Sequence, residues 1–249
     1  MYLLKQLCSK AGKACYDFSM LNNNDKILIC FSGGKDSYVL LKILIELRKK
    51  YPINFELKIL VINPNFDLNF ENKIKQFLNN ENIKNIQFEI LNTQIKKVIK
   101  KQNQIKKINP CFMCSRLRRG IIYNYALKNG YNKIALGHNL DDAIETHLMN
   151  FFYSSKTSFL KPKYLAENGS IEVIRPLIYI DEDLIVKYIN KTKFKIIENN
   201  CPLKKQKSNR EYFKKFIYEL KKRNPKIKQN AYHAFFNTLE LNSWIKKNK

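Results

Sequence analysis

The stretch Lys26-Ile-Leu-Ile-Cys-Phe31-Ser32-Gly-Gly-Lys-Asp-Ser37 decides the fold of this chain. Its first six residues are mostly apolar, which is typical of a strand buried on both faces. The next six are a turn, and apolar residues at helical spacing predict a helix over residues 37–50. A buried strand that passes through a glycine-rich turn into a helix is the first unit of a parallel α/β sheet.

The turn Ser32–Ser37 is suited to bind phosphate. Gly33 and Gly34 let the backbone turn tightly and approach an anion without a Cβ in the way. The backbone N–H groups and the helix N-terminus form the cradle, and the two serine hydroxyls add donors. Lys35 adds a positive charge, and Asp36 would hold a Mg²⁺ ion that bridges to phosphate. The Walker A pattern is absent, and the alternative is an ordinary strand-to-helix turn.

The rest of the chain alternates strands with helices. Further strands are expected at 57–62, 86–91, 133–137 and 171–174. Further helices are expected at 1–18, 69–79, 94–108, 115–129 (capped by Ser115) and 141–153, after Asp181, and from a capping box at Ser208–Glu211. This pattern predicts an α/β fold with a doubly wound, mostly parallel five-stranded, Rossmann-like sheet. Ligands bind beyond the carboxyl ends of such strands.

Composition bounds the class of protein. The chain has 249 residues, with 46 Lys plus Arg against 21 Asp plus Glu, for a formal charge of +25. This excess predicts an anionic partner, nucleic acid above all, unless the lysines reflect a compositional bias. No apolar run reaches the roughly 18 residues of a membrane helix, and no signal peptide is recognisable. A cytoplasmic, soluble protein without a membrane partner is expected.

A second motif, Gly137-His-Asn-Leu-Asp-Asp142 with Glu145-Thr146, follows the strand predicted at 133–137. Its position places it at the same sheet edge as Ser32. Gly137 would allow close approach of a nucleotide, with His138 beside it. Asp142 or Asp141 would bind Mg²⁺ or act as an acid–base group. The alternative is that these acids only complement the dipole of the next helix.

A third motif, Pro110-Cys-Phe-Met-Cys-Ser-Arg-Leu-Arg-Arg-Gly120, contains the pair Cys111 and Cys114. Such a pair can bind zinc, cycle as a dithiol, hold an iron–sulfur cluster, or have no chemical role. Placement at the start of a helix and the arginines that follow are expected to favour the thiolate form. These arginines are Arg116, Arg118 and Arg119.

The remaining cysteines supply one further ligand candidate. In a cytosolic protein, six cysteines do not indicate disulfides. Cys201 lies in a predicted loop and is the best third ligand, whereas three others are expected in the core: Cys8, Cys15 and Cys30. Three cysteines suit a cluster with one open iron. Structural zinc needs a fourth ligand, for which the candidates are His138, His147 and His233.

Together the three motifs resemble one family. Ser32–Ser37 resembles the pyrophosphate loop of the ATP-pyrophosphatase (PP-loop) superfamily, which has the adenine nucleotide alpha hydrolase type of fold. The second motif resembles its tRNA-modifying branch. Pro110–Gly120 and Ile174–Leu177 look like those of the tRNA-cytidine 2-sulfurtransferases (2-thiocytidine synthetases). The resemblance covers about residues 20–205.

The resemblance implies an enzyme, an ATP-dependent tRNA sulfurtransferase. ATP adenylates a pyrimidine 2-carbonyl, favoured as cytidine at tRNA position 32, and sulfur then displaces AMP. ATP would bind along Ser32–Ser37, with its adenine near Val61 and Asn63, while Lys35 and Mg²⁺ neutralise the pyrophosphate. Arg118 and Asp142 would orient the substrate or transfer protons.

The resemblance also implies cofactors and partners. A [4Fe–4S] cluster would be held by Cys111, Cys114 and Cys201. The partners would be tRNA, a sulfur donor (a cysteine desulfurase or sulfide), an electron donor and a second copy in a homodimer. The chain is divided into an N-terminal helical segment at 1–22, a PP-loop domain at 23–200 and a basic helical extension at 201–249.

The chain departs from the family in two places. A second C-x-x-C would place a cysteine at residue 204, which is Lys204. The stretch from Cys201 through Ser208–Lys222 resembles tRNA 2-thiouridine synthetases instead, so the target nucleoside stays open. Two other functions are also open: a PP-loop ligase with an amine nucleophile, similar to lysidine synthetases and with structural zinc, and a non-catalytic RNA-binding metalloprotein.

Two basic stretches, 96–107 and 204–228, flank the cysteines in sequence and would meet tRNA phosphates. Aromatic residues interleave the second stretch, and most are expected to form a buried stripe rather than to stack on bases. They are Tyr212, Phe213, Phe216 and Tyr218.

Overall fold

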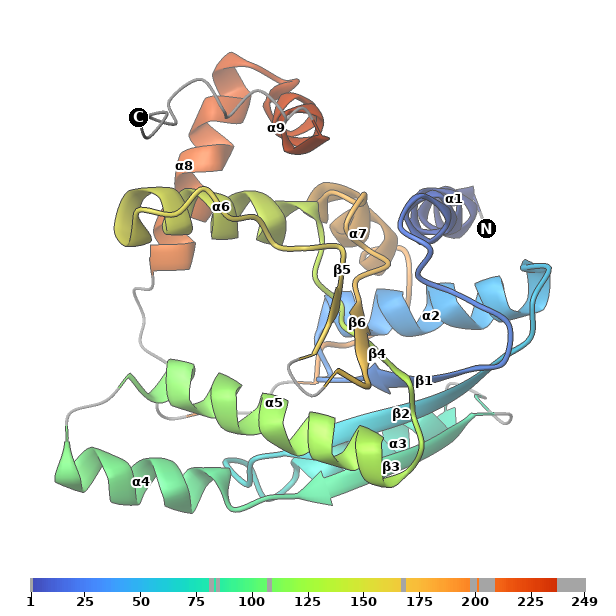
Figure 1. Cartoon of the computed structure of the whole chain (residues 1–249), viewed down its shortest axis with the longest axis vertical. Helices are drawn as coiled ribbons and strands as arrows, with labels where there is room; N and C mark the ends of the chain where they lie inside the picture. The colour runs from blue at the N-terminus through green and yellow to red at the C-terminus, as the bar shows by residue number, and fades with distance from the viewer. Residues whose placement is uncertain are drawn as a thin grey trace, which may run out of the picture.

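A computed structural model of the chain describes residues 2–80, 83, 86–106, 109–166, 169–197, 201 and 209–236. Its centre is a six-stranded sheet in the order β3-β2-β1-β4-β6-β5 (Figure 1). The strands are β1 (Asp25–Cys30), β2 (Phe55–Asn63), β3 (Gln87–Asn92), β4 (Lys133–Ala135), β5 (Lys163–Leu165) and β6 (Glu172–Ile174). Neighbours run parallel except β5, which pairs antiparallel with β6.

The sheet confirms the doubly wound α/β fold, but the expected number of five strands is wrong. The sixth strand, β5, is an edge strand of three residues, too short to show a pattern of its own. The strands of the sheet centre are buried on both faces. In β1, Ile27 and Ile29 pack into one core while Leu28 packs into the other, which explains the unbroken apolar run.

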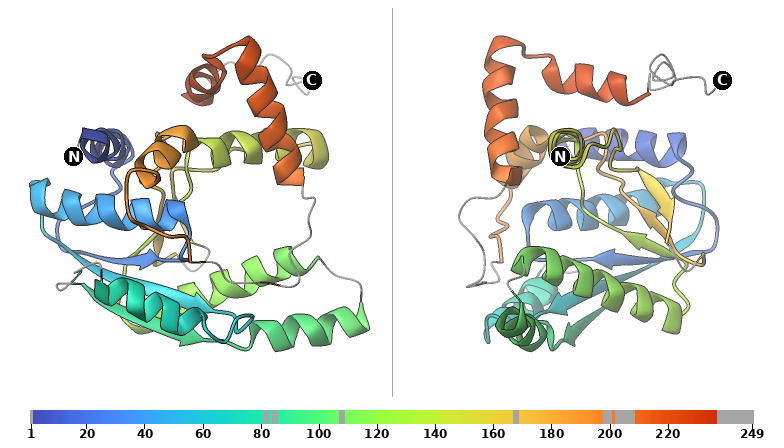
Figure 2. Two further views of the ribbon diagram at one scale, coloured as in Figure 1. Left: turned by 180° about the vertical axis from the view of Figure 1, so that it is seen from behind. Right: turned by 60° about the vertical axis from the view of Figure 1, so that its left-hand side comes forward.

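Helices cover both faces of the sheet. They are α1 (Tyr2–Asp17), α2 (Lys35–Lys50), α3 (Phe70–Asn80), α4 (Ile95–Ile105), α5 (Pro110–Lys128), α6 (Leu140–Ser154), α7 (Glu182–Ile189), α8 (Asn209–Arg223) and α9 (Ile227–Phe236). The larger core packs α1, α2, α3 and α7 against one face, and the smaller core packs α4 and α5 against the other. Helices α8 and α9 contact α6 and each other (Figure 2).

Helix boundaries follow capping residues. The Asp181 side chain accepts a hydrogen bond from the Leu184 N–H and caps α7, as expected. The cap expected at Ser115 is wrong, because α5 begins at Pro110 and Asn109 accepts the N–H of Cys111. The expected capping box at Ser208 lies outside the described residues, and helix α9 was not expected.

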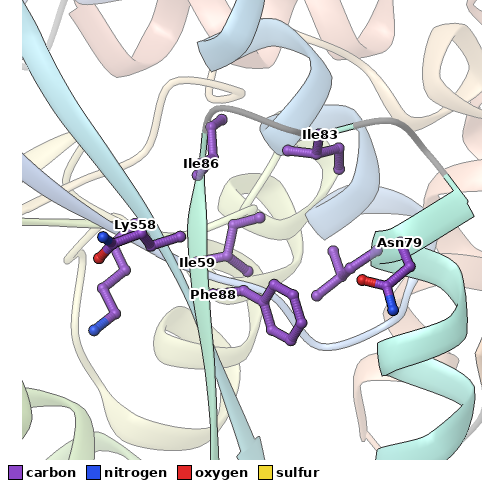
Figure 3. A pocket seen from close by; sticks show the side chains of 8 residues that line it. Lys58, Ile59, Asn79, Ile83, Ile86 and Phe88 are labelled. Carbon is purple, nitrogen blue, oxygen red and sulfur yellow. The ribbon is translucent and has the colours of Figure 1, made fainter.

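A cavity of about 710 Å³ lies away from the Ser32–Ser37 turn. It is bordered by Lys58, Ile59 and Phe88 near the amino ends of β2 and β3, with Asn79 of α3 opposite (Figure 3). Parallel α/β sheets bind ligands at the other edge.

No helix in the described part of the chain is long and apolar enough to cross a bilayer.

Candidate active site

The turn between β1 and α2 has the form of an anion cradle. Ser37 Oγ accepts a hydrogen bond from the Ser32 N–H at 3.2 Å and donates one to the Gly34 carbonyl at 2.8 Å, which fixes the turn. Helix α2 begins at Lys35, and no side chain of the described residues caps it. Its first N–H groups are therefore available to an anion at the positive end of the helix dipole.

Gly33 is the residue of this turn that no other amino acid can replace without strain. Its φ is +82°, and a Cβ would lie 2.7 Å from the Ile197 carbonyl oxygen. The Ile197 N–H donates to the Gly33 carbonyl at 2.9 Å, so the segment after α7 crosses the turn. Gly34 has an ordinary φ of −83°, and a Cβ there would meet only Ser32 Oγ, at 3.5 Å.

Lys35 is held by two carboxylates at the edge of the cradle. Its Nζ lies 2.8 Å from Asp36 and 2.8 Å from Glu182, the first residue of α7. Lys214 of α8 bonds the same Glu182 carboxylate at 2.7 Å. Burial alone would lower the pKa of Lys35, but Asp36 and Glu182 outweigh it and raise that pKa. Lys35 therefore carries a full positive charge beside the cradle.

The second motif packs directly on the turn. A Cβ on Gly137 would lie 3.1 Å from the Asp36 carbonyl carbon, so Gly137 allows two backbone segments to meet. This backbone contact alone requires a glycine at position 137, which also lines the cavity beside the turn. Asn139 caps α6 in a reciprocal capping box with Asp142, and its Nδ2 donates to Asp36 Oδ1 at 3.1 Å.

The three motifs share one cavity of about 450 Å³ at the carboxyl ends of the strands. Its polar lining includes Ser32, Gly34, Asp36, Ser37, Gly137, His138, Asp142 and Arg118, all predicted site residues. Apolar side chains, including Leu60 and Ile62 of β2, complete the lining. A cradle beside an apolar wall is the arrangement that a nucleotide needs.

The two residues predicted to lie near adenine, Val61 and Asn63, do not present their side chains to this cavity. Val61 is fully buried in the core on the opposite face of β2, because side chains alternate along a strand and Leu60 and Ile62 face the cavity. The Asn63 side chain donates to Asn92 and accepts the N–H of Asn65, so it holds the loop after β2. Neither side chain borders the cavity, and the position of adenine near the end of β2 stays a prediction.

A second cavity, of about 210 Å³, brings together the three cysteines predicted as ligands. Cys111 and Cys114 lie in the first turn of α5, and Cys201 approaches from the segment that precedes α8. None of the three histidines is among the residues that line it. In the described part of the chain, no three His, Cys, Asp or Glu side chains are arranged to hold a single metal ion.

The arginines do not make Cys114 a ready thiolate. Burial raises the pKa of the Cys114 thiol more than the Arg118 guanidinium lowers it. The expectation that helix start and arginines would favour the thiolate is therefore wrong for Cys114 in the unliganded chain. A bound metal would supply the missing positive charge.

Arg118 and Ser115 line both cavities. Arg118 lies one turn after Cys114 on α5, and its Nη2 donates to Cys114 Sγ at 3.9 Å. Among the described residues nothing accepts a hydrogen bond from its buried Nε. A buried donor without a partner is costly, so it is a place for an acceptor on a ligand.

Comparison with known proteins agrees with this geometry. The sequence model of the PP-loop domain family, ATP_bind_3, matches residues 4–220. The chain belongs to the PP-loop family. It is 37% identical over 236 residues to the tRNA-cytidine(32) 2-sulfurtransferase of Coxiella burnetii, which covers 94% of this chain and 90% of the relative.

Further relatives extend the comparison. The tRNA-cytidine(32) 2-sulfurtransferase of Paraburkholderia phytofirmans is 37% identical over 240 residues, 95% of this chain and 69% of the relative. Among solved structures, the U34-tRNA thiolase NcsA of Methanococcus maripaludis with its [4Fe–4S] cluster matches with a TM-score of 0.75 and 25% identity. The match covers 99% of this PP-loop protein and 84% of NcsA.

In this PP-loop protein the imidazole of His138 is neutral. Burial, followed by the positive charges of Arg175 and Arg210, lowers the pKa of His138 to about 3. Its Nδ1 accepts a hydrogen bond from Arg175 Nε at 3.1 Å. Arg175 lies directly after β6, so a residue of the Ile174–Leu177 stretch orients the histidine.

The two aspartates of the second motif have different surroundings. Asp141 accepts the N–H of Glu182 at 2.7 Å and pairs with Lys228 at 2.5 Å, which ties α6 to α7 and α9. Asp142 lines the cavity, although it also accepts the N–H of Asn139 at 3.0 Å. The geometry therefore favours Asp142 over Asp141 as the residue that meets a ligand.

Two residues were missed as site residues. Arg210 of α8 lies 3.5 Å from Asp142 and 3.4 Å from Glu145. Burial raises the pKa of Glu145 to about 7 although the Arg210 guanidinium opposes the shift. Glu145 was visible in the sequence as part of the second motif. Arg210 gave no signal, because it is one of many basic residues in its helix.

Proposed function

We propose that this PP-loop protein is an ATP-dependent tRNA 2-sulfurtransferase that acts on cytidine at position 32. The observation that carries the proposal is that Arg118 and Ser115 of one helix line both the phosphate-cradle cavity and the three-cysteine cavity. A carbonyl that is adenylated in the first cavity is then next to sulfur held in the second. The 37% identity to tRNA-cytidine(32) 2-sulfurtransferases supports the choice of nucleoside over 2-thiouridine formation.

The first step is adenylation. The triphosphate of ATP lies on the N–H groups at the start of α2, with Lys35 beside it. The cytosine 2-carbonyl oxygen attacks the α-phosphorus, the bond to the bridging oxygen breaks, and pyrophosphate leaves. Asp36 and Asp142 border this point and would hold Mg²⁺, which neutralises the departing charge. AMP on the carbonyl oxygen makes that oxygen a good leaving group.

The second step is sulfur transfer. Sulfur at the level of hydrosulfide attacks C2 of the base, the C2–O bond breaks, AMP leaves with the former carbonyl oxygen, and the sulfur loses its proton to the medium. Sulfur that arrives as a persulfide would first take two electrons from the electron donor. Arg118 has the place and charge to stabilise the AMP phosphate or the base in both steps, and its Nε has no protein acceptor in the described residues.

The three cysteines fit a [4Fe–4S] cluster. They line one cavity, none of the three histidines lies there to complete a zinc site, and no single-ion site is found in the described residues. Each thiolate of a cluster binds a different iron, so its ligands stand farther apart than those of one zinc ion. When bound, the cluster would offer one iron without a protein ligand to the sulfur that is transferred.

The partners follow from this chemistry. They are tRNA, a cysteine desulfurase or sulfide as sulfur donor, and an electron donor. The reaction would take place in the cytoplasm, where tRNA and ATP are both present. The homodimer and the division at residues 22 and 200 remain predictions from the resemblance.

The test is anaerobic purification of the wild type, Cys201→Ala and, as a control, Cys8→Ala, in which a cysteine of α1 is replaced. Iron, sulfide and zinc are measured, and each protein is incubated with ATP, sulfide and tRNA. We expect about four irons and four sulfides per chain and 2-thiocytidine at position 32 in the wild type and Cys8→Ala, with both lost in Cys201→Ala. One zinc ion with full activity, or thiolation of a uridine instead, would overturn the proposal.

A further inference from the structure

Five exposed aromatic side chains gather where α6 ends and α8 passes beside it. Phe151, Phe152 and Tyr153 are 53–62% exposed at the end of α6, and Tyr212 and Phe216 are 61% and 39% exposed on α8. We call these five residues the aromatic patch. The expectation that most aromatics of α8 are buried is wrong, because only Phe213 of the four is buried. Exposed aromatic groups of this size mark binding surfaces.

The patch is one surface because four of its rings surround Phe213 and the fifth, Phe151, meets Phe152 edge-on. The Phe213 ring stacks with Phe152 at 6.0 Å between centroids and meets Tyr153 edge-on at 5.9 Å. It also meets Tyr212 at 5.4 Å and Phe216 at 6.5 Å. Phe213 is only 3% exposed. A buried ring therefore holds the exposed ones in place, so a ligand would find them already ordered.

The patch lies on the helix that leads away from the proposed active site. Asp142 in the first turn of α6 borders the cavity, and Phe152 follows ten residues later on the same helix, roughly 15 Å along its axis. Helix α8 runs beside α6 (Figure 1), and its Arg210 contacts both Asp142 and Glu145. If a nucleic-acid loop placed one base in the cavity, the neighbouring bases of the same loop would reach the aromatic patch.

Charge selects the partner. Helix α8 has six basic and two acidic residues, and Lys214 and Lys215 are exposed beside the patch. Aromatic faces surrounded by basic side chains bind unpaired bases and the phosphates that join them. A second copy of the chain would be repelled, since a two-fold interface brings the same basic surface from both copies together. A homodimer would therefore use another face.

We infer that the aromatic patch binds unpaired bases of an RNA loop by stacking, next to the base that enters the cavity. The inference rests on the proposed function and adds the surface that recognises a loop rather than a duplex. Stacking on a flat face is tolerant of base identity, so the patch recognises unpaired structure and leaves the choice of base to the cavity.

The experiment measures RNA binding by the full chain without ATP or sulfide. The ligands are a 17-nucleotide anticodon stem-loop and a duplex of the same composition. The variant is Phe152→Ala with Tyr212→Ala. Tyr218→Ala is the matched control, because Tyr218 is 62% exposed on the same helix but lies about 200° around its axis from Phe216. Tyr212→Phe keeps the ring and tests whether stacking is sufficient.

We expect the double variant to bind the stem-loop about 10- to 100-fold more weakly, with duplex binding and the salt dependence of binding unchanged. Tyr218→Ala and Tyr212→Phe should bind like the wild type. Thermal unfolding checks that each variant is folded. If the double variant is unstable, Tyr212→Ala alone, which removes one exposed ring, is tested in its place.

Three outcomes would overturn the inference: equal binding by the double variant and the wild type, equal loss of stem-loop and duplex binding, or a change of mass in light scattering without loss of RNA binding. The last result would assign the patch to a second copy. If the wild type does not bind the stem-loop, the proposed function is overturned as well. If the wild type thiolates tRNA and the double variant binds the stem-loop normally, only the inference about the aromatic patch is overturned.

Discussion

Replacing Glu182 with glutamine should tighten ATP binding. Lys35, the lysine of the phosphate cradle, is absent from the cavity lining and pairs with Glu182 at 2.8 Å. To reach a phosphate, Lys35 must leave Glu182, so this ion pair competes with ATP. Lys214 holds the same carboxylate at 2.7 Å and keeps Glu182 paired after Lys35 has left.

The size of the gain in ATP affinity depends on how deeply the Lys35–Glu182 pair is buried and on how many other partners hold Lys35. The Lys35 and Glu182 side chains are 22% and 14% exposed, so their bond is shielded from water. A hydrogen bond between charged groups contributes about 1.5–3 kcal/mol. Asp36 still holds Lys35 in the variant, which favours the lower value, about a tenfold gain in ATP affinity. Lys214 is 56% exposed, and replacing it should weaken ATP binding only about twofold.

The assay is calorimetric titration with Mg²⁺ and a non-hydrolysable ATP analogue in the absence of tRNA, on Glu182→Gln, Lys214→Met and the double variant. Lys214→Met should have no effect in the glutamine background, because the carboxylate through which it acts is gone. Lys215→Met, on the next residue of α8, is the control and should bind like the wild type. Weaker binding by Glu182→Gln would refute the reasoning and show that Glu182 positions Lys35 for the phosphate.

Three further predictions concern the same site. Because burial raises the pKa of Glu145 from 4.5 to about 7, the folded protein keeps a proton that the unfolded chain has lost, and stability falls as the pH rises between these two values. Glu145→Gln should remove this slope, which amounts to at most about 3 kcal/mol in urea unfolding. Gly33→Ala should lower the free energy of unfolding by at least about 1–2 kcal/mol, whereas Gly34→Ala should leave it nearly unchanged in the same assay. His138 should stay neutral from pH 5 to 8, so a change of its imidazole nitrogen NMR shifts near pH 6.5 would contradict the burial argument.

The sequence predicted what local patterns determine. The β1–turn–α2 unit was identified because an apolar run, two glycines and a helical period are all short-range signals. The meeting of Ser32 and Gly137 followed from a rule of topology, since the carboxyl ends of neighbouring parallel strands share an edge. The approach of Cys201 to Cys111 had a weaker signal: its place in a predicted loop made Cys201 the best third candidate, and the family resemblance completed the ligand set.

Errors arose where a pattern is uniform or a contact is distant. Residues 57–62 are buried on both faces, so no alternation shows which side chains face the cavity, and Val61 was chosen instead of Ile62. The start of α5 was misplaced although Asn109 and Pro110 are a favoured cap and first residue. The Lys35–Glu182 ion pair was not predicted, because the two residues are far apart in the sequence and the chain has many other charged residues that could pair.

The position of Arg118 explains why one helix can couple two chemical steps. Cys114 and Arg118 are four residues apart on α5, so they lie on the same face, and the helix cannot move one without the other. Two of the three proposed cluster ligands, Cys111 and Cys114, are thus fixed in the same rigid element as the residue that borders the proposed ATP cavity. In the proposed reaction the activated carbonyl would therefore not have to travel between an adenylation site and a sulfur site, and a reactive adenylate would have less time to meet water.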